Sequence, residues 1–138
     1  MTKYYIDGYT ELGNPSPTGG GYTITDSKGK VLITKRVKKK GLTSNEAEML
    51  GLYRALRKCK KGDVISTDSQ NNISWVSNGR SKSRPDLNEL LYKCFFVRNK
   101  KWIEVIWEPR EKNLAGIYNE NEKLDTAKPP VNAFDYLN

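Results

Sequence analysis

A short apolar run that ends on an acid marks the middle of this chain: Val64-Ile65-Ser66-Thr67-Asp68. Turn-forming residues precede the run at 60–63, and Ser69-Gln70 follow it. A run this short and apolar, bounded by turns, is typical of a buried strand in a parallel sheet. Ligands of open α/β sheets bind beyond the carboxyl ends of such strands. We therefore expect Asp68, at the end of this strand, to face a functional site.

The segment before that strand, residues 42–59, has the clearest helical pattern in the chain. Its apolar residues recur at helical spacing: Met49, Leu52, Tyr53 and Leu56. Thr43 followed three residues later by Glu46 is a capping box, which predicts the start of the helix. Glu48 borders the apolar stripe and therefore the face that packs on the sheet. We choose Glu48 over the capping Glu46 as the residue that carries chemistry.

The remaining elements follow outward from this centre. Strands are expected at residues 3–9, 21–25, 31–37 and 102–107, and helices at 69–76, 86–96 and 119–128. The first three strands form an antiparallel meander, since a turn signal lies between the second and third. The order predicts an α/β fold with a mixed five-stranded sheet, three antiparallel strands and then parallel ones, flanked by helices. We expect one domain over residues 1–138, with 129–138 as a C-terminal tail.

The composition bounds the class of protein. The chain has 138 residues, enough for one domain with a core, and 24 Lys plus Arg against 16 Asp plus Glu give a formal charge of +8. This charge favours a polyanionic partner, although a merely soluble basic surface is about equally consistent with it. The basic run at 35–40 has two readings of equal weight, protection of an edge strand and contact with phosphates.

Histidine is absent from the sequence. The commonest general base and transition-metal ligand is therefore missing, and oxygen ligands that hold magnesium or manganese are the natural alternative for hydrolysis.

Cys59 and Cys94 are expected to be buried free thiols in a reducing compartment. The charged start of the chain lacks a signal-peptide pattern, and no apolar run approaches the ~20 residues that span a bilayer. We expect a cytoplasmic protein that makes no membrane contact.

Four acids lie in distinct local contexts along the chain. Asp7 lies in the first strand, Glu48 in the helix and Asp68 at the strand end, while Asp125 lies in the last helix. If these four converge, they can hold two divalent ions that clamp the attacking and leaving oxygens of a phosphodiester. If they do not converge, each is a surface acid.

The motifs around these acids, taken in order, resemble type 1 ribonuclease H from about residue 3 to 128. They are Asp7-Gly8 with the following turn at 13–21, Thr43-Ser44-Asn45-Glu46-Ala47-Glu48, Thr67-Asp68-Ser69-Gln70, and the stretch 107–113 with Asn121-Glu122-Lys123-Leu124-Asp125. Each motif alone is weak, whereas the ordered set is specific. The resemblance implies a ribonuclease H-like fold and endonucleolytic hydrolysis of the RNA strand of RNA/DNA hybrids.

The resemblance also assigns roles to residues. The four acids Asp7, Glu48, Asp68 and Asp125 would be catalytic and bind two Mg²⁺ ions, for which Mn²⁺ can substitute. The residues that match contacts to the minor groove of the hybrid are Asn14, Ser44, Asn45 and Gln70, and Thr43 matches a residue that holds a DNA phosphate. We add Lys39 and Lys40 as nucleic-acid contacts, and we expect a monomer.

The sequence departs from the family pattern in three places. The loop before the last acid offers Glu111, Lys112 and Asn113 where family members often carry a histidine. Tyr9 is bulky where a small residue is usual. The connection at 77–84 is too short for the long basic protrusion of many bacterial members. Binding of a hybrid would then depend on other basic residues. The candidates are Lys38, Lys39, Lys40, Arg80, Lys82 and Arg84.

Two other classes of function compete with this interpretation. One is a differently specific nuclease of the same fold, such as a resolvase-like protein or a domain derived from a reverse transcriptase. The other is a non-catalytic module that binds hybrids. A non-catalytic module would be favoured by the loss of one of the four acids, and all four are present in the sequence.

Overall fold

A computed structural model describes residues 1–127, with side chains described as far as Lys123. The expected tail at 129–138 lies outside the described residues. The elements in chain order are β1 (Lys3–Thr10), β2 (Gly19–Asp26), β3 (Val31–Lys38), α1 (Ser44–Lys58), β4 (Val64–Thr67), α2 (Gln70–Asn78), α3 (Asn88–Lys100), β5 (Glu104–Trp107) and α4 (Leu114–Ala127), with short 3₁₀ turns at Pro85–Leu87 and Arg110–Lys112.

The five strands form one mixed sheet in the order β3-β2-β1-β4-β5. Strands β1, β2 and β3 pair antiparallel, whereas β4 pairs parallel with β1 and with β5. This arrangement confirms the fold class predicted from the sequence. It places β1 beside β4 in the centre of the sheet, so Asp7 and the end of β4 are neighbours.

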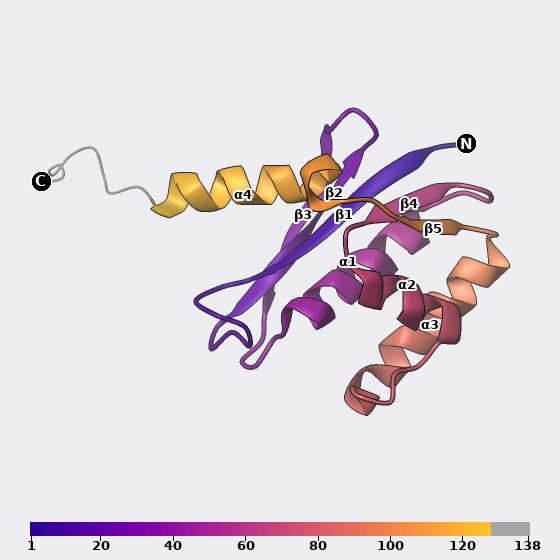
Figure 1. Cartoon of the computed structure of the whole chain (residues 1–138), viewed down its shortest axis with the longest axis horizontal. Coiled ribbons are helices and arrows are strands. Elements are labelled where there is room, and N and C mark those ends of the chain that lie inside the picture. Colours follow the sequence, from indigo (N-terminus) through magenta and orange to yellow (C-terminus); the bar gives the residue numbers. More distant parts are fainter. Residues whose placement is uncertain (128–138) are drawn as a thin grey trace, which may run out of the picture.

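The helices form two groups against the sheet, with α1, α2 and α3 together and α4 apart from them (Figure 1). Helix α1 packs on β1 and β2 and is joined by α2 and α3, while α4 contacts β1 and β2 on its own. The core between sheet and α1 is built from fully buried aliphatic side chains that include Ile6, Ile24, Leu52, Leu56 and Ile65. None of the helices in the described part of the chain combines the length and apolar character needed to cross a bilayer.

Gly8 sets how closely α1 approaches β1. A Cβ atom at this position would lie 2.5 Å from the backbone nitrogen of Glu48 and 2.6 Å from the carbonyl carbon of Ala47. Real side-chain atoms do not approach so closely, so only glycine fits here. The consequence is that Glu48 is held directly against the strand that carries Asp7.

Two expectations about helix starts need correction. The last helix begins at Leu114 and not near 119, because the Asn113 side chain caps it by accepting from the backbone N–H of Ala115 and Gly116. Gly116, a poor helix former, hides this start in the sequence. At α1, Thr43 accepts from the Glu46 N–H as predicted, but the Glu46 carboxylate pairs with Lys39 at 2.5 Å instead of closing the capping box.

Strand β3 is an edge of the sheet, as one reading of its basic run requires. Arg36 forms a salt bridge with Glu11 at 2.8 Å. Cys59 and Cys94 are both buried free thiols, which confirms the sequence prediction of their state.

Candidate functional site

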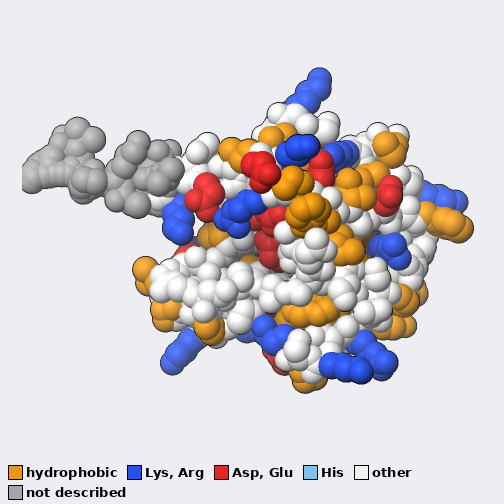
Figure 2. Space-filling view, viewed as in Figure 1, with side chains coloured by type: hydrophobic (Ala, Val, Ile, Leu, Met, Phe, Trp, Pro, Cys, Tyr) orange, Lys and Arg blue, Asp and Glu red, His pale blue; other side chains and the backbone are white. Residues whose placement is uncertain are grey.

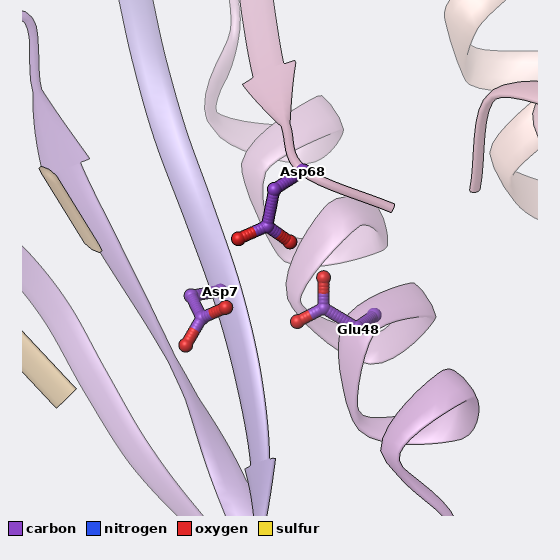
Figure 3. Close-up of side chains that lie close together, drawn as sticks. All are labelled: Asp7, Glu48 and Asp68. Carbon is purple, nitrogen blue, oxygen red and sulfur yellow. The ribbon is translucent and has the colours of Figure 1, made fainter. Parts of the chain in front are cut away.

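Three of the four predicted acids meet in space. One carboxylate oxygen from each of Asp7, Glu48 and Asp68 lies within 4.8 Å of the others. Asp7 comes from β1, Glu48 from α1 and Asp68 from the end of β4, and their carboxylates point toward one another (Figure 3). We call these three residues the carboxylate triad. Rigid elements hold all three, as a metal centre requires.

One oxygen of the triad has no partner. Glu48 is 6% exposed, its Oε2 accepts from the backbone N–H of Gly8, and its Oε1 is buried without a hydrogen bond. A buried carboxylate oxygen without a donor is costly, and a cation is the group that relieves this cost. The donor set consists of hard oxygen atoms only, which suits Mg²⁺ or Mn²⁺.

The pKa values of Asp7 and Glu48 show that these carboxylates are buried and that the charges of the triad repel one another. Burial raises the pKa of Asp7 to about 6, and the charge of Asp68 adds to the rise. Burial also raises the pKa of Glu48 well above its usual value, with the charge of Asp7 as the next cause. Carboxylates that repel one another in a poorly hydrated place favour protonation until a positive ion neutralises them.

Two amides on the α4 side orient the triad. The Nδ2 atom of fully buried Asn113 donates to Ile6 O at 2.9 Å and to Asp68 Oδ2 at 3.2 Å. Asn119 Nδ2 donates to Asp7 Oδ2 at 2.9 Å. Neither amide was predicted from the sequence to belong to the site. A signal was present for Asn113, because an Asn just before a helical stretch is a preferred N-cap.

The side chain of Asp125, the fourth predicted acid, lies outside the described side chains, and its role stays a prediction. Nearer the triad, Arg110 pairs with Glu120 at 3.1 Å. Burial alone would lower the pKa of Arg110, but the charge of Asp7, the hydrogen bond to Glu120 and the charge of Asp68 raise it overall. A fixed positive charge therefore lies close enough to the triad to interact with two of its members.

The predicted minor-groove residues gather at the starts of α1 and α2. The Asn14 side chain donates to Ser44 Oγ at 2.8 Å and accepts from the Ser44 backbone at 3.0 Å. Asn45 accepts from Asn71 at 3.5 Å, which joins the two helix starts. Gln70, the residue before Asn71, is exposed at the first position of α2. These contacts place small polar groups at the start of α1, the helix that carries Glu48, and beside that start.

One basic residue, Arg84, contacts the Thr43 cap. Arg84 Nη1 donates to Thr43 Oγ1 at 2.8 Å, and its Nη2 pairs with Asp86 at 2.9 Å. Lys39 forms a salt bridge with Glu46, while Lys40 is exposed.

Acidic atoms lie recessed near the middle of one face of the molecule, and Lys and Arg side chains project around them (Figure 2). This alternation of sign suits a phosphate backbone that passes over a metal centre.

Comparisons with known proteins agree with this geometry. The model of a family described as "Reverse transcriptase-like" matches residues 6–117. LC11-RNase H1, isolated from compost by a metagenomic approach, is 28% identical with a TM-score of 0.65, over 91% of this chain and 96% of that one. A structure of LC11-RNase H1 in complex with an RNA/DNA hybrid is 27% identical with a TM-score of 0.61, over 82% and 88%.

A third structure is similar in fold alone. RNase H1 from the halophilic archaeon Halobacterium salinarum NRC-1 is 24% identical with a TM-score of 0.65, over 91% of this chain and 98% of that one. The family match over residues 6–117 and the two LC11-RNase H1 structures, together with this shared fold, confirm the resemblance to type 1 ribonuclease H.

Proposed function

This chain belongs to the reverse transcriptase-like family and has the ribonuclease H fold, and on that premise we propose that it is a metal-dependent endonuclease that hydrolyses the RNA strand of RNA/DNA hybrids. The observation that carries the proposal is the carboxylate triad with the unpartnered Oε1 of Glu48. We expect two Mg²⁺ ions, with Mn²⁺ as a substitute. A relative crystallised with an RNA/DNA hybrid supports the choice of substrate.

The residues present fit divalent ions, and Asp7, Glu48 and Asp68 would hold them. When bound, such ions supply an activated water and neutralise the charge that develops on the phosphate. The chain itself keeps the ligands in place. Gly8 donates to Glu48, Asn113 donates to Asp68 and Asn119 donates to Asp7, so each carboxylate keeps one oxygen bound to the protein. This support limits the movement of the ligands, on which the rate depends.

Recognition of the hybrid would fall to the polar groups at the helix starts. RNA differs from DNA by its 2′-OH, which is displayed in a wide minor groove. The amides of Asn14, Asn45 and Gln70 can donate to and accept from such a hydroxyl. Thr43, Lys39, Lys40 and Arg84 would contact phosphates, which adds affinity without sequence preference.

A cleavage assay tests the proposal directly. A hybrid whose RNA strand is end-labelled is incubated with the protein in Mg²⁺, in Mn²⁺ and in a chelator, with duplex DNA of the same sequence in parallel. We expect internal cuts in the RNA only with metal, and no cuts in Glu48→Gln. The matched control is Glu89→Gln, since Glu89 is exposed on α3 and its pair with Lys93 contributes little.

The outcomes separate the candidate functions. Intact RNA after long incubation with either metal would overturn the proposal. Equal cutting of duplex DNA would indicate a nuclease of different specificity, such as a resolvase-like protein.

A further inference from the structure

Helix α4 meets the carboxylate triad with one narrow face. Asn113, Gly116 and Asn119 lie three residues apart and so follow one side of the helix start. A Cβ atom at Gly116 would lie 3.5 Å from the Asp7 carboxyl carbon, and the two amides donate to Asp68 and Asp7. The α4 side of the site, among the residues whose side chains are described, is thus occupied by a glycine and two amides.

An acid that approached the triad from α4 would need a position on this same face. Asp125 is nine residues beyond Gly116 in a helix that runs to Ala127. At 1.5 Å per residue and 3.6 residues per turn, its Cα lies about 13 Å further along the axis and on the opposite side. Glu120, nearer along the helix, is engaged by Arg110 at 3.1 Å.

The side chain of Asn119 is held by hydrogen bonds that allow it to orient the carboxylate of Asp7. Its Oδ1 accepts from Thr23 Oγ1 at 2.6 Å, and Thr23 Oγ1 lies 3.2 Å from Thr34 Oγ1. These bonds fix the amide so that its NH₂ group faces Asp7 Oδ2. One carboxylate oxygen of Asp7 faces Glu48 and Asp68 (Figure 3).

We propose that Asp7, Glu48 and Asp68 hold the divalent ions without a fourth carboxylate from α4, and that Asn119 is the positioning residue that takes its place by orienting Asp7. The proposal rests on the proposed function, because it concerns the same metal centre. It implies that Asp125 is dispensable for metal binding. Outer partners of metal ligands commonly affect affinity by 10–100-fold, so the loss of Asn119 should be measurable.

Metal binding itself is the readout, measured by calorimetric titration of the purified protein with Mn²⁺ and Mg²⁺ and by the rise in melting temperature. Asp125→Asn should leave the dissociation constant unchanged. Asn119→Ala should weaken binding by roughly tenfold or more. The matched control is Asn121→Ala, the same change at an exposed position of the same helix, and it should bind metal as the unmodified protein does.

A second variant protects the test from misfolding. Thr23→Val removes the donor that fixes the Asn119 amide and leaves the triad and α4 intact, so it should weaken metal binding in the same direction by a smaller factor. A circular dichroism spectrum and a melting curve in chelator identify any variant that fails to fold.

The outcomes for the three-carboxylate site and for the metal-dependent function can be told apart. Loss of metal binding in Asp125→Asn would overturn the three-carboxylate site. Normal binding in both Asn119→Ala and Thr23→Val would overturn the positioning role of Asn119. Either result would leave the proposed function in place. An unmodified protein that binds neither ion would instead overturn the metal-dependent function.

Discussion

Replacement of Asp7 by asparagine should have opposite effects on stability with and without metal. Asp7 is 6% exposed and lies against two other carboxylates. Its pKa is raised from an ordinary value of 3.8 to about 6, first by burial. The folded state therefore holds a proton between these pH values that the unfolded chain has lost. Stability falls as the pH rises through this window, and the full penalty is present above about pH 6.

The size of the effect follows from the pKa. The difference between 3.8 and about 6 corresponds to roughly 3 kcal/mol at neutral pH, and this is an upper figure because the site can relax. Asp7→Asn removes the charge and keeps the shape, so the metal-free variant should be more stable by on the order of 1–3 kcal/mol at pH 7.5. At pH 3.5, below both pKa values, the acid is largely protonated in both states and most of the gain should disappear.

In divalent ions, the unmodified protein should instead be more stable than Asp7→Asn. An ion that binds only the folded unmodified protein stabilises it by about 2.7 kcal/mol at a hundred times its dissociation constant and by about 4.1 kcal/mol at a thousand times, and the second figure exceeds the whole gain expected for the variant in chelator. The variant lacks a ligand and should gain little beyond the effect of equal ionic strength of sodium.

Urea unfolding followed by circular dichroism measures these differences, in chelator at pH 7.5 and pH 3.5 and in Mg²⁺ at pH 7.5. Glu89→Gln, a neutralisation on the exposed face of α3, controls for net charge. The reasoning would be refuted by an unmodified protein that is more stable than Asp7→Asn in chelator at pH 7.5, since the carboxylates would then not repel one another in the folded state.

Three further results are expected. Asp68→Asn should abolish cleavage in the gel assay yet keep hybrid binding and a native circular dichroism spectrum, because Asp68 ends a strand and contributes little to packing; a loss of fold would contradict this. Glu46→Gln should cost on the order of 1 kcal/mol in urea unfolding and keep most of the activity, since Glu46 pairs with Lys39 outside the triad; inactivity would place Glu46 in the site. Gly8→Ala should destabilise the protein by several kcal/mol, because a Cβ atom there would lie 2.5 Å from the α1 backbone, and an unchanged urea midpoint would show that α1 can move away.

The local patterns of the chain were sufficient to predict the order of strands and helices and to single out three acids that the fold brings together. The strand that ends at Asp68 could be predicted from the sequence alone, because a buried apolar run and the acid that follows it are both local features. The choice of Glu48 over Glu46 also followed from local periodicity, because the position of a residue relative to an apolar stripe fixes which face of the helix it shares.

Tertiary structure alone decided what surrounds these acids. Asn113 and Asn119 touch Asp68 and Asp7 from more than 40 residues away along the chain, and no periodicity within α4 specifies a partner in another element. The convergence of Asp7, Glu48 and Asp68 depends on the pairing of β1 with β4 and on the close approach of α1 at Gly8. Sequence patterns report which face of an element is apolar, whereas the distance between polar groups on different elements is set only when the core between those elements is packed.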